Sequence, residues 1–545
     1  MADHFIGIDV GTGSARAGVF DSEGRLLASA KRAISIWREE GDIVEQSSND
    51  VWQAVVFSVR EAMRQSGVAP EDVKGLGFDA TCSLVVLDGE GRPLPVGPSE
   101  DPERNIIVWM DHRALDQAQR INAGGYDVLR YVGGRISPEM ETPKLLWLKE
   151  NRPQVFGAAA HFFDLADYLS WRATGSTNRS VCTVTCKWTY LAHEKRWDAG
   201  YFKAIGLGEL AENDFARIGT EVVDIATPLG NGLTTDAAEE LGLAPGTPVG
   251  ASLIDAHSGG VGTFAGRRAD GTTLAPERQM ALIMGTSACA MTLSREATFV
   301  DGVWGPYSGA MVPGFWLLEG GQSAYGAALD HLVTLHPAYP TVKAAADTAG
   351  QSLPAYLEAQ ALALAGSLEE AALLARSVHV VPEFLGNRAP YADPEATAVI
   401  DGLGLDASPA SLVRLYVAGL CGLCYGTRQI VAAEQAKGVP LDTLVVSGGA
   451  AVSPLFRQIL ADATGLAVAL PQTSEPVLLG GAIVGAVAAG AYPSIEAAAG
   501  AMSRIKETIS PAGGSVAAFH EAKFKAFCLL QDADREIRGL MRAAG

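Results

Sequence analysis

The stretch Ile8-Asp-Val-Gly-Thr-Gly-Ser-Ala-Arg16 joins two apolar, β-type runs through a turn of glycines and hydroxyl residues. The run from Phe5 to Val10 precedes the turn and the run from Ala17 to Asp21 follows it. A third run, Leu26 to Ala30, comes after the turn residues Ser22-Glu-Gly. Short apolar runs separated by Gly-containing turns are typical of hairpin-linked strands. The sequence therefore predicts three consecutive antiparallel strands at this end of the chain.

A helix and a buried strand follow these three strands. Asn49-Asp-Val-Trp offers a cap and a start for the helix, and Val73 to Ala80 is apolar enough for an interior strand. The same order recurs more loosely in the second half, where Met280 to Ser287 and Leu444 to Ala450 are strands that end on glycines. The repetition predicts an α/β fold made by duplication, with a cleft between two lobes.

The division between the lobes is expected near residues 258–275, where Gly266-Arg-Arg-Ala-Asp-Gly is polar and loop-like. We therefore predict an N-terminal lobe over residues 1–262 and a C-terminal lobe over residues 263–545. The segment Pro245 to Gly260 crosses from one lobe to the other, and its glycines are candidate hinge positions.

Length, composition and charge narrow the function. A chain of 545 residues is too long for one core, and 48% hydrophobic with 19% charged residues is the balance of a packed globular protein. The formal net charge of -20 argues against a nucleic-acid or anionic-membrane partner. It does not exclude a phosphate ligand, because a few backbone amides and one cation can hold phosphates locally.

Seven scattered cysteines do not form a disulfide framework and indicate a reducing compartment. Cys421 and Cys424 have redox or metal spacing, but they lie in an apolar helical stretch and are expected to be buried thiols. No signal peptide is indicated at the N-terminus, so we expect a cytoplasmic protein. The most apolar stretch, Pro476 to Gly490, is too short to span a bilayer.

Several glycine sites could bind the phosphates of a nucleotide, since bare backbone lets N–H groups approach phosphate oxygens. Taken alone, the first site fits an ordinary turn as well as a phosphate site, and the sites at Gly285 and Gly448 fit a turn or helix entry better. Phosphate binding, however, requires several amide clusters that converge from both lobes, and the chain supplies three. Asp9, at a strand end, could hold Mg²⁺ through water. The candidate nucleotide-binding residues are Gly11, Thr12, Ser14, Arg16, Gly285, Thr286, Gly321, Gln322, Gly448, Gly449 and Ala450.

Taken together, these motifs resemble the FGGY family of carbohydrate kinases over nearly the whole chain. The landmarks are Ile8 to Arg16, Trp109-Met-Asp-His-Arg113, Lys144 to Asn151, Asp255-Ala-His, Met284 to Ser287, Phe384 to Pro390 with Asp393, and Ser447 to Ala450. The resemblance implies a duplicated actin-like ATPase (ribonuclease H-like) fold. It also implies that ATP and Mg²⁺ are used, with the sugar and one phosphate loop on the N-terminal lobe and the nucleotide on the C-terminal lobe.

The resemblance assigns the role of catalytic base to Asp255. A sugar hydroxyl that attacks a phosphoryl group needs an acceptor for its proton, and a carboxylate at a strand end in the cleft can supply it. His257 is also attractive as a proton shuttle, but a histidine beside a carboxylate often only orients it, so we do not include it. Nine histidines without paired spacing argue against zinc.

The candidate sugar-binding residues are Thr81, Cys82, Ser83, Trp109, Asp111, Lys187 and Asp255. The stretch Thr81-Cys-Ser-Leu-Val85 resembles that of D-ribulokinases in the family, which implies phosphorylation of D-ribulose to D-ribulose 5-phosphate. It lacks the Arg-Glu pair of glycerol kinases and the Met-His pair of xylulokinases. L-Ribulokinases remain close through Asp255-Ala-His and Lys187, so L-ribulokinase or xylulokinase activity is kept as an alternative.

Two further classes remain open: an actin-like or chaperone-like ATPase, and a family member that binds sugar only as a sensor. No client-binding domain is visible in the sequence, which argues against the first. Asp9, Asp255 and the glycine sites are all present, which argues against the second. A homodimer through an exposed helix of the second half is left open.

Overall fold

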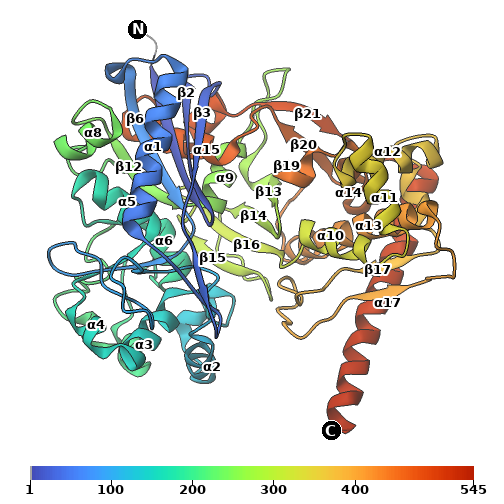
Figure 1. Ribbon diagram of the computed structural model, residues 1–545, viewed down its shortest axis with the longest axis horizontal. Coiled ribbons are helices and arrows are strands. Elements are labelled where there is room, and N and C mark those ends of the chain that lie inside the picture. The colour runs from blue at the N-terminus through green and yellow to red at the C-terminus, as the bar shows by residue number, and fades with distance from the viewer. Residues whose placement is uncertain (1–2, 545) are drawn as a thin grey trace.

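The computed structural model describes residues 3–544 and contains two lobes, each built on one sheet (Figure 1). The first sheet has the order β12-β6-β1-β2-β3 and the second β15-β16-β14-β13-β19-β20-β21. Read from β3 to β12, the first sheet has two antiparallel pairings followed by two parallel ones. The second sheet has the same sequence of pairings from β16 to β20, so β3-β2-β1-β6-β12 corresponds to β16-β14-β13-β19-β20. The shared order confirms the predicted duplication.

The first sheet comprises β1 (His4–Gly11), β2 (Ser14–Asp21), β3 (Leu26–Ala33), β6 (Val73–Ala80) and β12 (Val249–Ile254). The second comprises β13 (Gln279–Met284), β14 (Ala288–Ser294), β15 (Trp304–Ser308), β16 (Trp316–Gln322), β19 (Thr443–Ser447), β20 (Ala467–Pro471) and β21 (Ile505–Ile509).

Burial along the strands follows from their positions in the sheet. The interior strand β1 is buried on both faces and is accordingly a continuous apolar run. The edge strand β3 alternates between half-buried and exposed residues and carries Lys31 and Arg32, charges that discourage pairing with another chain.

Helix α1 (Ser48–Ser66) covers the first sheet, but its cap lies two residues earlier than the sequence predicted. Its cap is Ser47, whose hydroxyl accepts a hydrogen bond from the Asp50 backbone N–H at 3.2 Å, rather than Asn49. Serine and asparagine are comparable caps, so the sequence alone could not decide between them. Gly67 ends the helix in the left-handed conformation.

A smaller sheet of order β4-β5-β8-β7-β9 and several helices complete the first lobe on the side of the cleft. These strands are β4 (Trp37–Glu39), β5 (Ile43–Gln46), β7 (Leu84–Leu87), β8 (Ile106–Ile107) and β9 (His161–Asp164). The helices are α2 (Leu115–Ala123), α3 (Glu141–Asn151), α4 (Pro153–Ala158), α5 (Leu165–Thr174), α6 (Val181–Lys187), α7 (Ala199–Ala204) and α8 (Thr235–Leu241).

Two helices cross between the lobes with their backbones in contact. They are α9 (Asp255–Thr263) and α15 (Pro476–Ala488). A Cβ atom added at Gly262 would lie 1.9 Å from the Pro476 carbonyl oxygen, and one added at Gly480 would lie 1.9 Å from that of Ser258. Only a residue without a side chain therefore fits at these two positions of the crossing. The hinge role of the glycines between Pro245 and Gly260 stays a prediction.

Helix α15 also covers the sheet of the first lobe, although it comes from the second half of the chain. Leu478, Leu479 and Ala482 belong to the same buried core as Phe5 and Phe20. Gly7 on β1 has the Leu478 carbonyl oxygen 1.7 Å from where its Cβ atom would stand. The division of the chain into lobes between residues 262 and 263 stays a prediction. Helix α15 shows that a segment beyond residue 263 packs in the first lobe.

The core helix of the second lobe is α13 (Pro409–Ala436). By length and composition it could cross a membrane, but 83% of its apolar window is buried inside the protein. Cys421 and Cys424 are free and fully buried within it, as expected. Around it lie α10 (Gly326–Thr334), α11 (Tyr339–Thr348), α12 (Leu353–Ala365), α14 (Pro454–Thr464), β17 (His379–Val381) and β18 (Val399–Asp401).

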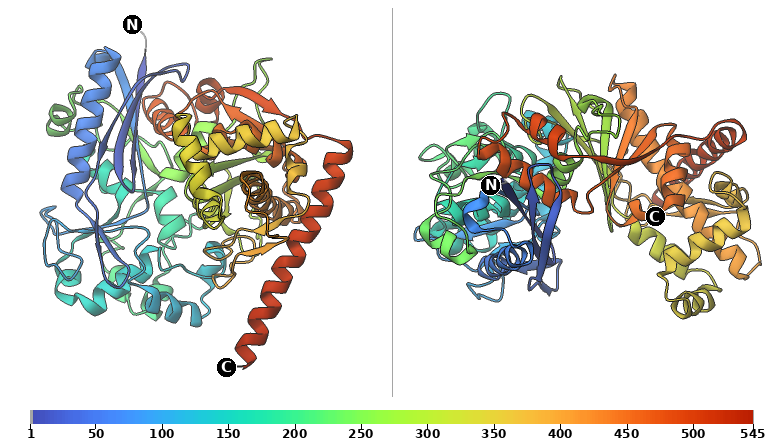
Figure 2. Two further views of the ribbon diagram at one scale, coloured as in Figure 1. Left: turned by 45° about the vertical axis from the view of Figure 1, so that its right-hand side comes forward. Right: turned by 90° about the horizontal axis from the view of Figure 1, so that it is seen from above.

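The C-terminal helix α17 (Gly514–Ala544) begins against the second lobe and then projects beyond it (Figure 2). Side chains of its projecting part are exposed although apolar, namely Leu529, Ile537, Leu540 and Met541. Arg538 fixes one side of the helix to the body through an ion pair with Asp393.

Candidate functional site

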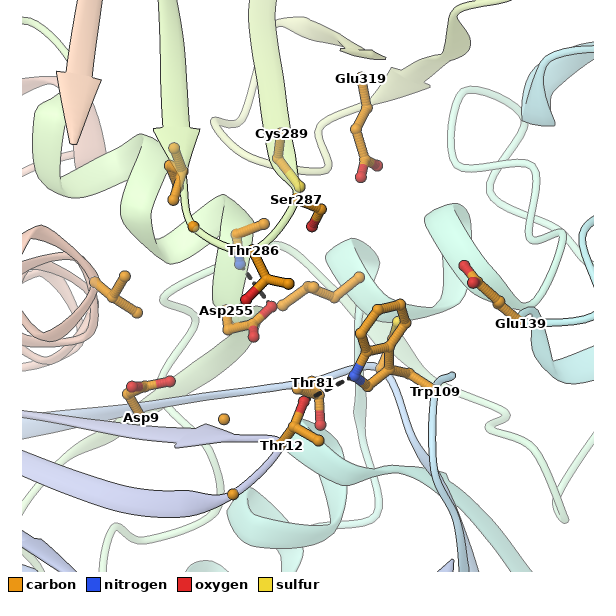
Figure 3. Close-up of a pocket in the computed structure, with 18 of the residues that line it drawn as sticks. Asp9, Thr12, Thr81, Trp109, Glu139, Asp255, Thr286, Ser287, Cys289 and Glu319 are labelled. Atoms are coloured by element: carbon orange, nitrogen blue, oxygen red, sulfur yellow. Dashed lines mark hydrogen bonds between the residues drawn. The ribbon is translucent and has the colours of Figure 1, made fainter. Parts of the chain in front are cut away.

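Asp255 lies at the first position of α9, directly after β12, at the wall of a cavity of about 440 Å³. The cavity is bounded by the turn between β1 and β2 on one side and the turn between β13 and β14 on the other. Figure 3 shows the Asp255 carboxylate between Thr286 of the second turn and Asp9 and Thr12 of the first. Its Oδ1 atom accepts a hydrogen bond from the Ala256 backbone N–H at 2.7 Å. The duplicated sheets thus bring the predicted base and two predicted phosphate turns together.

The two turns leave their backbones bare toward the cavity. Gly11, Thr12 and Ser14 line it from the first lobe, and Gly285 and Thr286 from the second. A Cβ atom added at Gly13 would meet nothing within 4 Å, so this turn is open to a ligand. Such glycine and hydroxyl turns at the ends of strands fit the phosphates of a nucleotide.

Asp9 and Arg16 face each other across the first hairpin, in register. Arg16 Nε donates to Asp9 Oδ2 at 2.7 Å, and its Nη1 lies 2.9 Å from the Glu475 carboxylate. The guanidinium was predicted to bind nucleotide, but in this structure it pairs with two carboxylates at the cavity wall. Asp9 remains placed to hold Mg²⁺ through water, which the oxygen chemistry of that ion favours. Within residues 3–544, no cluster of three His, Cys, Asp or Glu side chains could bind a metal directly.

A second cavity of about 340 Å³ meets the first at Gly285 and Thr286. Gly449 and Ala450 line it on one side. The remaining walls are largely apolar and include Leu329, Leu357, Tyr416, Leu420 and Phe456. An apolar slot that opens onto a glycine-lined phosphate site suits a flat, weakly polar base.

Gly448 supports this slot from behind. It adopts φ +90°, and a Cβ atom there would lie 2.3 Å from the Met284 carbonyl oxygen. Glycine is therefore required to bring the ends of β19 and β13 together.

Gly321 and Gln322 do not line either cavity, contrary to the prediction. The Gln322 amide donates to the Leu423 carbonyl oxygen at 3.0 Å and to the Thr427 hydroxyl at 3.1 Å, which ties β16 to α13. A Cβ atom at Gly321 would lie 2.2 Å from the Ala288 carbonyl oxygen of the neighbouring strand. Both residues hold the sheet together, and the glycine that suggested a nucleotide site reflects tight strand pairing.

Thr81, Cys82, Trp109 and Lys187 line the other end of the cavity, as predicted for sugar-binding residues. The Trp109 indole N–H donates to the Thr12 hydroxyl at 2.9 Å (Figure 3). This bond fixes the aromatic wall against the phosphate turn. The combination of an aromatic wall with small polar groups suits a polyol.

Ser83 and Asp111 lie behind this wall and do not face the cavity, which corrects the prediction for both. The Ser83 hydroxyl accepts from the Trp109 backbone N–H at 3.1 Å. Asp111 is fully buried, pairs with Arg113 and accepts from the Val44 backbone N–H at 2.6 Å. A buried arginine needs a carboxylate partner, and this requirement accounts for Asp111 without a substrate.

The prediction missed several cavity residues with side chains suited to a sugar, among them Glu139, Cys289, Trp304, Glu319 and Arg388. Glu319 had a usable signal, since it is a charge inside the otherwise apolar run Trp316-Leu-Leu-Glu-Gly-Gly. Arg388 comes from the second lobe in a motif quoted above and lies 5.7 Å from the centre of the Trp304 ring. Lys187 lies 5.0 Å from the same ring centre. Two cationic side chains therefore lie against the Trp304 ring at the sugar end.

The charges in the cavity shift one another's pKa values. Burial, together with the negative charge of Asp9, raises the pKa of Asp255 to about 6. Burial alone would raise the pKa of Glu319, but Lys187 and His257 outweigh it and lower that pKa to about 2. Burial alone would lower the pKa of Lys187, but Glu319 outweighs it and raises that pKa. Near neutral pH the site thus holds a charged Lys187, a charged Glu319 and a mostly ionised Asp255.

Comparison with known proteins gives two family matches that together cover most of the chain. The N-terminal domain model of the FGGY family of carbohydrate kinases matches residues 4–262, and the C-terminal domain model matches residues 280–489. The chain is 44% identical to the human "FGGY carbohydrate kinase domain-containing protein", over 99% of this chain and 98% of that one.

A second relative is the D-ribulokinase YDR109C of Saccharomyces cerevisiae, 38% identical over 89% of this chain and 72% of its own length. Among solved structures, a xylulose kinase from Rhodospirillum rubrum superposes with a TM-score of 0.79. It is 22% identical, over 98% of this chain and 99% of that one. The predicted duplicated actin-like ATPase fold is therefore confirmed.

Proposed function

The chain belongs to the FGGY family of carbohydrate kinases, and we propose that it transfers the γ-phosphoryl group of ATP to the terminal hydroxyl of a ketopentose. The observation that carries the proposal is the position of Asp255. Its carboxylate stands between two glycine turns, in a sugar-sized cavity that meets the apolar slot at Gly285 and Thr286. A general base is needed at this position for the attack of a hydroxyl on a phosphoryl group.

Different cavity residues would hold the nucleotide, accept the proton and bind the metal ion. The bare turns at Gly11 to Ser14 and at Gly285 to Thr286 would hold the phosphates, and the slot at Gly449 and Ala450 would hold the adenine. Asp255 would accept the proton of the attacking hydroxyl. Mg²⁺, held through water by Asp9, would neutralise charge on the phosphates.

D-Ribulose is the first-choice substrate, with D-ribulose 5-phosphate as the product. Support comes from the yeast D-ribulokinase relative and from the small side chains of Thr81 and Cys82 at the sugar end. Lys187 and Glu319 would donate to and accept from the hydroxyls of the open-chain sugar. A cytoplasmic location and a homodimer through an exposed helix of the second lobe remain part of the proposal.

A coupled assay over D-ribulose, L-ribulose, D-xylulose, ribitol and glycerol tests the substrate. We expect the highest kcat/KM with D-ribulose, because Lys187 and Glu319 offer a donor and an acceptor for a ketopentose and the chain lacks the residues expected for glycerol or xylulose. Phosphorus NMR of the product should place the phosphate on the terminal carbon. Turnover no higher than background with every ketopentose would refute the proposal. A higher kcat/KM with L-ribulose or D-xylulose would reassign the substrate within it.

Sugar binding without turnover would instead favour the sensor. ATP hydrolysis that no sugar stimulates would favour an ATPase of another class.

A further inference from the structure

Three buried side chains form a chain that runs from the first lobe to the second beneath the sugar end of the cavity. Cys182 lies on α6, His257 on α9 and Glu319 on β16. The Cys182 sulfur lies 3.1 Å from His257 Nδ1, and His257 Nε2 lies 3.5 Å from Glu319 Oε2. Cys182 and His257 are fully buried, whereas Glu319 lines the cavity.

The surroundings of Cys182 favour its thiolate. Its sulfur accepts a hydrogen bond from the Ile254 backbone N–H at 3.3 Å. Burial alone would raise the pKa of Cys182, but hydrogen bonding with Cys186 and the charge of His257 lower that pKa to about 5. A buried cysteine held as an anion needs a cationic partner, and His257 is in contact with it.

His257 is charged because two acidic groups, Cys182 and Glu319, lie beside it. Burial alone would lower its pKa, but Cys182 and Glu319 outweigh burial and raise that pKa to about 10. With Nδ1 donating to the sulfur, Nε2 carries the second proton and lies 3.5 Å from Glu319 Oε2, an ion pair without a hydrogen bond. The imidazolium therefore links a carboxylate of the second lobe to a thiolate of the first.

We propose that Cys182 is a positioning residue for the sugar: through His257 it fixes Glu319 in the orientation that faces the cavity. The inference rests on the proposed kinase function, since it assigns Glu319 a sugar hydroxyl. Cys182 touches neither substrate and acts only through His257. An ordinary packing role for the thiol would require neither the short contact to Nδ1 nor the bond from Ile254.

Replacing Cys182 with serine tests this chain, because a hydroxyl fits the site but does not ionise. We expect the KM for the sugar to rise about tenfold, as for the loss of a hydrogen bond to a charged group. The KM for ATP should not change and kcat should stay within about threefold. Val184→Ala, which removes a buried side chain from the same helix, is the matched control and should leave the KM for the sugar unchanged.

The pH dependence separates positioning from packing. In Cys182→Ser, His257 should lose its proton within the assay range, so lowering the pH from about 9 to about 6.5 should restore the KM for the sugar. The wild-type KM should stay flat over that range. The titratable groups around His257 are Cys182, Cys186 and Lys187 on α6, Glu319 on β16, Asp255 on its own helix and Tyr307 on β15.

Nitrogen NMR of histidine-labelled wild-type protein decides the charge state without any assay of activity. We expect His257 to be doubly protonated at about pH 8, far above the usual histidine pKa. A neutral His257 in wild-type protein, or a Cys182→Ser variant with an unchanged KM for the sugar, would overturn the proposal. If His257 is protonated but the protein phosphorylates no sugar, the proposed kinase function is wrong, while the inferred charge state of His257 is correct.

Discussion

Replacing Asp255 with asparagine is expected to lower kcat for sugar phosphorylation by about 10³-fold, the size of effect that a positioned general base contributes. Asparagine has nearly the same shape and its side-chain oxygen can still accept the hydrogen bond from the Ala256 N–H, but it cannot take up the proton of the attacking hydroxyl. The variant should fold as well as wild type, because the change removes a partly buried negative charge beside Asp9.

Steady-state kinetics with the preferred ketopentose measures the loss, and isothermal titration calorimetry should give a sugar Kd close to that of wild type. Wild-type kcat/KM should fall as the pH is lowered through about 6, because Asp255 must be ionised to act and its pKa is raised to about 6. A variant that keeps more than about a tenth of wild-type kcat would remove Asp255 from the role of base.

Replacing Gly480 with alanine is expected to prevent stable folding or to lower the free energy of unfolding by at least about 3 kcal/mol. The added Cβ atom would stand 1.9 Å from the Ser258 carbonyl oxygen and 2.6 Å from its carbonyl carbon. Since those atoms are backbone, the only relief is to separate α9 from α15. Asp255 begins α9, so the separation should also reduce kcat in any protein that still folds.

Thermal and urea unfolding measure the effect, and Gly539→Ala provides the control. Gly539 also lies in a helix, α17, but a Cβ atom there meets nothing within 4 Å. Alanine at this position should be neutral or slightly stabilising, because it lowers the entropy of the unfolded chain. Equal stability of Gly480→Ala and wild type would contradict the account of the crossing.

The sequence predicted the duplicated sheets and the phosphate turns because these features are local. A strand that ends on glycines, such as Ile8 to Gly11, can be recognised without knowledge of the rest of the protein. Asp111 was misassigned because the sequence does not reveal that Arg113 is buried with it. Glu319 was missed because its function depends on partners such as Lys187, more than a hundred residues away in the chain. Gly321 was misassigned because a glycine demanded by strand pairing and one demanded by a phosphate look alike in sequence.

The position of α15 has a consequence for recombination between relatives. Its apolar residues complete the core under β1 and β6, and Ile495 and Met502 farther along the second half belong to the same core. A chimaera that joins residues 1–262 of this protein to the second half of a relative would cover β1 with a foreign helix. The close approaches at Gly7 and Gly480 would then join backbone from one protein to backbone from another, and both partners would have to fit. The lobes are therefore not exchangeable modules, and the two halves of the gene are expected to change together.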